Sequence, residues 1–377
     1  MDVHTTVPTP AFLDVATTPD NTGGAARRGA AAMSPMLVVK NLKKHFPIRG
    51  GLLNRKIGAV HAVDDISFTV FKGETLGVVG ESGCGKSTLA RLLMYLTPPD
   101  SGGISFQGHL VGESSGLPLR DLRRSLQMVF QDSYSSLNPR LPVEASVAYG
   151  PRVHGASSSK ACATARELLG KVGLKPEIFG PRYPHELSGG QKQRVNIARA
   201  LALQPKMLIL DEAVSALDKS VEAQVLNLLR QLKREFDLTY LFISHDLNVV
   251  QYISDRVMVM YLGQVVELGP VDQIYHEPKH PYTAALLQSR LAMDPDDKVL
   301  TPPLTGDPPS PINPAPGCRF RSRCQFAEAV CEAKAPTLEA WANRASHVAA
   351  CHMADPQSGH SRAGTPASQA VKEELAR

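Results

Sequence analysis

The feature that most constrains this chain is a glycine-rich segment at residues 80–87, GESGCGKS, which matches the phosphate-binding pattern G-x-x-x-x-G-K-[ST]. It lies between Glu74–Val79, an apolar segment that predicts a strand, and Ser87–Leu96, which predicts a helix. Glycines let backbone N–H groups turn toward phosphate oxygens, and the helix N-terminus adds the positive end of its dipole. In such a loop Lys86 would reach the β- and γ-phosphates, and the Ser87 hydroxyl would bind Mg²⁺. The segment therefore predicts a nucleoside triphosphate site.

The segments around this loop predict an α/β fold. Apolar strand patterns alternate with helical patterns at Ser125–Phe130, 191–203, Met207–Leu210, 220–236 and Thr239–Ile243. Uniformly apolar strands between helices are typical of a parallel sheet that is covered on both faces. Short strand patterns before the loop, around a Gly/Arg-rich turn near 49–58, predict an antiparallel β layer. The chain of 377 residues is 43% hydrophobic, which excludes a wholly disordered protein.

Polar residues follow three of the predicted strands. Asp211 and Glu212 come directly after Met207–Leu210, while Gln131 and His245 follow two other strands. Because ligands gather at the carboxyl ends of strands in open α/β sheets, we expect these side chains at one site. We assign Asp211 to Mg²⁺ and Glu212 to the attacking water. Gln131 would contact Mg²⁺ or water, and His245 would bind a γ-phosphate.

A second glycine motif, Leu187–Gln191 (LSGGQ), directly precedes the helical pattern QKQRVNIARALAL. It places a hydroxyl and bare backbone amides at a helix N-terminus, and so predicts a second phosphate-binding surface. One ATP does not need two such surfaces. The second could therefore serve a nucleotide that another molecule holds.

In their order along the chain, these motifs resemble those of the ATP-binding subunits of ABC transporters. The resemblance covers roughly residues 36–290 and includes LILDE at 208–212 and SALD at 215–218. It implies an α/β P-loop ATPase with a mixed sheet core, an antiparallel β layer and a helical signature subdomain, as well as a head-to-tail pair of ATPase domains. Each ATP would lie between the P-loop of one subunit and the signature residues of the other, and Asp218 would cross the interface.

The resemblance also implies a set of nucleotide contacts. Phe46 matches the aromatic residue that stacks on adenine, and an ordinary core Phe is the alternative that its pattern leaves open. The catalytic set comprises Glu212, His245 and Gln131, and the Mg²⁺ set comprises Ser87, Gln131 and Asp211. The remaining ATP-binding residues are Gly80, Ser82, Gly83, Cys84, Gly85, Lys86, Ser87 and Thr88, with Ser188, Gly189, Gly190 and Gln191 acting in trans.

Further segments look like the oligopeptide/dipeptide importer branch, in particular its second ATPase. These are QDSYSSLNPR (131–140), HPYTAALL (280–287) and PPSPINPAPGCRF (308–320). The resemblance implies two membrane permeases, a second homologous ATPase (or a second copy) and an extracytoplasmic binding protein, with this subunit peripheral on the cytoplasmic face of the membrane. Nickel import, export and a non-transport role in translation or DNA repair are the alternatives.

Charge and hydropathy agree with this expectation. The 41 basic and 36 acidic residues leave a net charge of +5 that is spread along the chain, which indicates no nucleic-acid partner and no polybasic membrane anchor. We find no run of 18 apolar residues, so transport would need separate membrane subunits.

Four cysteines, Cys318, Cys324, Cys331 and Cys351, lie within 34 residues with the spacing C-x5-C-x6-C-x19-C. The spacing matches neither common zinc sites nor the usual ferredoxin patterns, so it leaves a metal site and unlinked thiols open. Disulfides are not expected with ATP and Mg²⁺ in a reducing compartment. The family resemblance implies a [4Fe–4S] cluster on these four residues, with zinc as the alternative.

The predicted domain boundaries follow from these patterns. Residues 1–35 are expected to be a disordered tail, and 36–290 the ATPase domain, with the helical subdomain at about 132–200. Residues 291–353 form a Pro- and Cys-rich extension, with seven prolines between 299 and 316. Residues 354–377 are expected to be a second disordered tail.

Overall fold

The computed structural model describes residues 34–50, 54–112, 116–132, 135–289, 307, 309–338, 343 and 346–375. The predicted N-terminal tail lies outside the described residues except for its last two positions, which lead into the first strand. Within the described part of the chain, no helix has the length and apolar character that spanning a membrane requires.

The first layer is a four-stranded antiparallel sheet in the order β2-β1-β4-β5. Its two long strands form a hairpin, and its two short strands follow the first helix: β1 (Pro35–Gly50), β2 (Arg55–Phe71), β4 (Ser101–Phe106) and β5 (His109–Leu110). Register shifts along β1 and β2 bend the hairpin. The predicted antiparallel layer is present, but its strands are long where the sequence indicated short ones.

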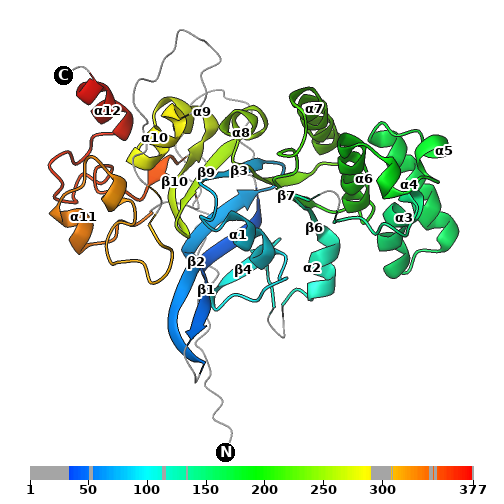
Figure 1. Cartoon of the computed structure of the whole chain (residues 1–377), viewed down its shortest axis with the longest axis horizontal. Coiled ribbons are helices and arrows are strands. Elements are labelled where there is room, and N and C mark those ends of the chain that lie inside the picture. The colour runs from blue at the N-terminus through cyan, green and yellow to red at the C-terminus, as the bar shows by residue number, and fades with distance from the viewer. Residues whose placement is uncertain are drawn as a thin grey trace, which may run out of the picture. The chain divides into compact units, whose positions relative to one another are not determined.

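The second layer is a seven-stranded sheet in the order β11-β10-β9-β3-β8-β7-β6 (Figure 1). Its strands are β3 (Thr75–Val79), β6 (Leu126–Val129), β7 (Met207–Asp211), β8 (Thr239–Ile243), β9 (Arg256–Tyr261), β10 (Gln264–Pro270) and β11 (Val348–Ala349). The five strands from β9 to β6 pair in parallel. Because β3, β8 and β7 are neighbours, the segments that follow them meet at one edge of the sheet.

Helices cover this sheet and connect its strands. They are α1 (Lys86–Leu93), α2 (Leu119–Ser125), α7 (Lys219–Glu235), α8 (Leu247–Ile253), α9 (Val271–His276) and α10 (Pro281–Gln288). The apolar stripe of α7, with Val225, Leu229 and Leu232 fully buried, packs into the same core as Tyr240 and Phe242 of β8.

A helical part lies between β6 and β7 and projects beside the sheet (Figure 1). It contains α3 (Val143–Val153), α4 (Ser158–Lys171), α5 (Pro176–Phe179), a 3₁₀ turn (Pro184–Glu186) and α6 (Gly189–Leu201). Buried Val147, Leu169 and Val195 join these helices in one core. Together these helices span residues 143–201.

The C-terminal extension folds against the sheet. It contains a 3₁₀ turn (Arg321–Arg323), α11 (Ala329–Ala333), β11 and α12 (Ala367–Leu375). Strand β11 pairs antiparallel with β10, and the Ser368 N–H donates to the carbonyl of Pro278, 3.0 Å away.

The expectation of a disordered tail at 354–377 is wrong for its described part, because these residues are folded. Ala370 and His360 are buried, and the His360 ring lies 2.9 Å from the carbonyl of Phe326. The polar composition misled the prediction, because burial here uses small and hydrogen-bonded residues.

Candidate active site

The phosphate-binding loop joins β3 to α1 and is held closely against neighbouring backbone. Gly80 and Gly85 have φ angles of +151° and +109°. A Cβ at Gly80 would lie 2.2 Å from the Met260 carbonyl oxygen, and one at Gly85 would lie 2.1 Å from that of Ala62. Only glycine fits these two positions, because both the conformation and the space exclude a side chain.

Lys86 is buried and directed at its own loop. Its ammonium donates to the carbonyl oxygens of Gly80 at 2.7 Å and Glu81 at 3.0 Å. Its nitrogen also lies 3.8 Å from the Cys84 sulfur. Burial raises the pKa of the Cys84 thiol, which keeps it protonated against the opposing influence of Lys86. Cys84 therefore fills space under the loop as an uncharged thiol.

Asp211, at the end of β7, faces the start of α1. Its Oδ1 accepts a hydrogen bond from the Ser87 hydroxyl at 3.3 Å. Burial raises the pKa of the Asp211 carboxyl, Ser87 lowers it, and the neighbouring Glu212 raises it again. A buried carboxylate and a half-buried hydroxyl at this distance offer two oxygen donors of the kind that Mg²⁺ prefers. Two of the three predicted Mg²⁺ ligands, Ser87 and Asp211, are thus brought together.

Glu212 lies at the centre of a polar cluster made by three strand ends. Its Oε2 accepts from the Gln131 amide at 2.7 Å, and its Oε1 lies 3.4 Å from His245 Nδ1. Glu212 has a left-handed φ of +49°, and its N–H donates to the Ile243 carbonyl at 2.9 Å. A non-glycine residue in this conformation costs free energy and is common at functional sites. The structure therefore assembles all three residues of the predicted catalytic set.

The LSGGQ segment forms the N-terminus of α6, as expected. Ser188 is the N-cap: the Gln191 N–H donates to its hydroxyl at 3.4 Å, and the Gln191 side chain accepts from the Ser188 N–H at 3.0 Å. Close to the two glycines lie Leu217 and Val221, on either side of Asp218. Ser188 and Asp218 are both exposed. The second glycine motif and the SALD segment therefore share one accessible surface.

Phe46 lies on β1 opposite Val60 and is 41% exposed, so it is not a core residue. The Lys44 ammonium lies 5.8 Å from the centre of its ring. An exposed aromatic face on the β layer leaves a surface on which an adenine could stack.

A His–Asp cluster neighbours Phe46 on the hairpin. The rings of His45 and His61 stack with centroids 3.7 Å apart, and both rings approach the Asp64 carboxylate. Their potential ligand atoms lie within 4.8 Å of one another. The Arg319 guanidinium pairs with the same carboxylate, so Asp64 links the hairpin to the C-terminal extension through an ion pair.

The four cysteines of the extension line one small cavity together with His280, Phe320 and His352. Burial raises the pKa of Cys318, and it raises the pKa of Cys324 and of Cys351 to about 12. Nearby cysteines act in the same direction on all three. Among the described residues, no three of these sulfurs lie within 4.8 Å of one another.

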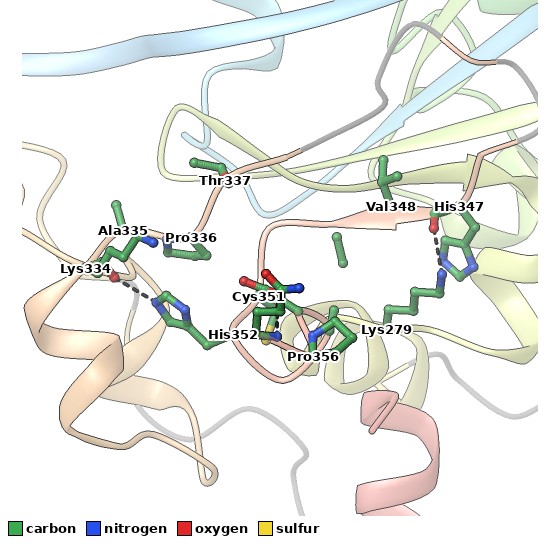
Figure 2. A pocket seen from close by; sticks show the side chains of 14 residues that line it. Lys279, Lys334, Ala335, Pro336, Thr337, His347, Val348, Cys351, His352 and Pro356 are labelled. Carbon is green, nitrogen blue, oxygen red and sulfur yellow. Dashed lines mark hydrogen bonds between the residues drawn. The ribbon is translucent and has the colours of Figure 1, made fainter. Parts of the chain in front are cut away.

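A larger pocket of about 640 Å³ lies beside this cavity, and Cys351 and His352 line both. Figure 2 shows the pocket, in which the Lys279 ammonium donates to the His347 carbonyl at 2.7 Å and His352 bonds to the Lys334 carbonyl at 2.8 Å. Of the four cysteines, Cys351 therefore also borders the larger pocket.

Two contacts of the loop were not expected from the sequence. Arg323 and Tyr282, both from the C-terminal part, bind Glu81 of the phosphate-binding loop. The segments that contain them stand out in the sequence only as HPYTAALL and as the cysteine segment. No local pattern connects either segment to a loop that lies 201 residues before Tyr282 and 242 residues before Arg323.

Two family models match separate stretches of the chain. Residues 63–215 match the family model described as "ABC transporter", and residues 266–331 match "Oligopeptide/dipeptide transporter, C-terminal region". The chain is 48% identical over 331 residues to the oligopeptide transport ATP-binding protein AppF of Bacillus subtilis, covering 86% of this chain and 99% of that protein.

A second relative is the dipeptide transport ATP-binding protein DppF of Escherichia coli, 45% identical over 328 residues, with 86% of this chain and 96% of that protein covered. Among solved structures, the dimeric post-hydrolysis state of the ATP-binding cassette MJ0796 with ADP and Pi superposes with a TM-score of 0.54 at 26% identity. It covers 63% of this chain and 99% of that one. This protein is therefore an ABC-type ATPase, and it belongs to the family of ATP-binding subunits of oligopeptide and dipeptide ABC transporters.

Proposed function

We propose that this chain hydrolyses ATP to energise the import of oligopeptides or dipeptides across the cytoplasmic membrane. The observation that carries the proposal is the match of residues 266–331 to the oligopeptide/dipeptide C-terminal region, a segment whose strand β10 pairs with β9 of the central sheet. Relatives such as AppF and DppF are named for oligopeptide and dipeptide transport.

The proposed assembly contains two membrane permeases, a second ATPase and an extracytoplasmic binding protein, with this subunit on the cytoplasmic face. The exposed Ser188 and Asp218 support pairing with a second ATPase, because a phosphate-binding helix terminus on an accessible surface can complete a site on another subunit. The likeness to a dimeric cassette supports the same arrangement.

We propose the following roles within each ATP site. Lys86 binds the β- and γ-phosphates, and the loop amides from Ser82 to Thr88 surround them, while Phe46 stacks on adenine. Ser87, Asp211 and Gln131 hold Mg²⁺. Glu212 orients and polarises the attacking water. His245, which lies beside Oε1 of the Glu212 carboxylate, binds the γ-phosphate.

Uptake of labelled peptide tests the transport assignment. We expect membrane vesicles that contain the permeases, both ATPases and the binding protein to accumulate a labelled dipeptide or oligopeptide only with wild-type Lys86. Accumulation of nickel without peptide would assign the nickel alternative. Recovery of the protein on ribosomes or DNA, without permeases, would contradict the transport function.

We further propose that Cys318, Cys324, Cys331 and Cys351 hold a [4Fe–4S] cluster. The donor set fits, since four thiols line one cavity. Burial raises the pKa of three of them and so disfavours the thiolate, and a bound metal would stabilise the thiolate form. The cluster would act as a structural staple for a segment with little apolar core.

Metal analysis of anaerobically purified protein tests this second proposal. We expect about four iron and four sulfide per chain, the content of one such cluster, with a visible absorbance band that is lost in Cys324→Ser. One equivalent of zinc without iron would replace the cluster by the zinc alternative. Absence of both metals would leave four unlinked thiols and refute the proposal.

A further inference from the structure

Glu81 places a carboxylate inside the loop that is proposed to bind the negatively charged phosphates of ATP. Like charges at close range repel, and the repulsion is strongest where water is partly excluded. The side chain of Glu81 is 22% exposed. The loop therefore needs a means to neutralise this carboxylate.

Arg323, from the 3₁₀ turn of the extension, supplies that neutralisation. Its two terminal nitrogens lie 2.9 and 3.0 Å from the two carboxylate oxygens of Glu81, which is a bidentate ion pair. The Arg323 side chain is only 6% exposed, and its guanidinium lies 6.0 Å from the centre of the Tyr261 ring. A planar cation fixed on both a carboxylate and an aromatic face has little freedom to leave.

The main chain of Glu81 is held by the C-terminal part as well. Its N–H donates to the hydroxyl of Tyr282 at 2.9 Å. Tyr282 is fully buried, and its ring packs against Tyr261 and against Phe320 of the extension, with centroids 4.6 and 5.4 Å away. The Glu81 carbonyl is also one of the acceptors of Lys86. Glu81 thus links the extension to Lys86, the lysine that we propose binds the phosphates of ATP.

We propose that Arg323 is a positioning residue for ATP binding, which neutralises Glu81 and keeps its carboxylate in an ion pair with the extension instead of beside the phosphates. The C-terminal extension is on this proposal a part of the nucleotide site. The inference goes beyond the transported substrate and the group on the cysteines, and it stands whichever of those is correct.

The test is the dissociation constant for a fluorescent ATP analogue, measured on the full chain without turnover. We expect Arg323→Ala to weaken binding about tenfold, equivalent to about 1.4 kcal/mol. Arg323→Lys restores the charge without the bidentate geometry, so its loss is intermediate. In the background Glu81→Gln, where there is no carboxylate to neutralise, Arg323→Ala should change the dissociation constant less than twofold.

Arg321→Ala is the matched control, because Arg321 belongs to the same 3₁₀ turn but donates to the carbonyls of Pro316 and Cys318 within the extension. We expect it to bind the analogue with nearly wild-type affinity. An equal loss in Arg321→Ala, or a full tenfold loss that persists in Arg323→Ala/Glu81→Gln, would show a general disturbance of the extension and overturn the proposal. Wild-type affinity in Arg323→Ala would overturn it directly.

In steady-state hydrolysis, Arg323→Ala should raise KM for ATP while kcat changes less than twofold, since the ion pair does not touch the reacting atoms. If Arg323→Ala instead lowered kcat about tenfold and left KM for ATP unchanged, the positioning role in ATP binding would be contradicted.

Discussion

The ATPase core and the C-terminal extension are stabilised in different ways. The core buries continuous apolar strands, such as Leu208 and Leu210 of β7, under amphipathic helices. The extension has a far smaller apolar cluster, around Phe326, Met353 and Ala370. It relies on ion pairs, four thiols and strand pairing to the core. The comparison shows that a segment with little hydrophobic burial of its own can still be ordered where polar contacts with a rigid neighbour replace that burial.

The largest effect should come from the core site. Glu212→Gln keeps the geometry but removes the carboxylate that we assign to the attacking water, so we expect hydrolysis to fall at least ~1000-fold, about 4 kcal/mol, while ATP binding is retained. Phosphate release and nucleotide binding, measured on the same preparation, check both parts. Turnover within threefold of wild type would remove Glu212 from the catalytic set.

The next largest effect is the loss of unfolding free energy when a buried ion pair in the core is broken. Arg256 is 2% exposed, donates to Glu74 at 3.2 Å and to the Thr69 carbonyl at 3.1 Å, and lies over the Phe71 ring. Arg256→Met leaves Glu74 buried without its cation, which should cost about 3 kcal/mol of unfolding free energy. Urea denaturation measures this loss, and the double variant with Glu74→Gln should recover more than half of it.

A smaller effect concerns the junction between the two regions. Burial lowers the pKa of His280 to about 4, against an opposing influence from Glu267. Since the unfolded chain binds the proton near pH 6.5, the folded protein loses stability as the pH falls below that value, by about 2 kcal/mol between pH 7 and 5. His280→Gln should flatten this part of the curve. A pH profile identical to wild type would mean that His280 is not the titrating group.

The smallest effect separates stability from activity in the core. Burial raises the pKa of Asp211, so its charge destabilises the folded protein at neutral pH. Asp211→Asn should therefore gain about 1 kcal/mol of stability while Mg²⁺-dependent hydrolysis is lost. Thermal melting without nucleotide checks the gain. A lower melting temperature would indicate that the hydrogen bond with Ser87 outweighs the burial of the charge.

Sequence patterns predicted the core far better than the extension, for a physical reason. The phosphate-binding loop, the carboxylates after β7 and the signature at α6 each depend on a strand or helix next to them, so local periodicity located them. The ion pair of Arg323 with Glu81 joins residues 242 positions apart, and nothing near either residue predicts the other. The polar segment 354–375 was likewise misjudged, because its order comes from contacts such as that of His360 with Phe326.

The pairing of β11 with β10 has a consequence for the behaviour of the whole molecule in solution. Val348 and Ala349 cover Leu268 and Glu267, and the Ala350 N–H reaches the Val266 carbonyl at 2.8 Å. Without β11, the N–H and C=O groups along this edge of β10 would be unpaired. An exposed edge strand of this kind can pair with a strand of another molecule and start aggregation. The pairing with β11 therefore leaves fewer backbone groups of β10 open to pairing with another chain.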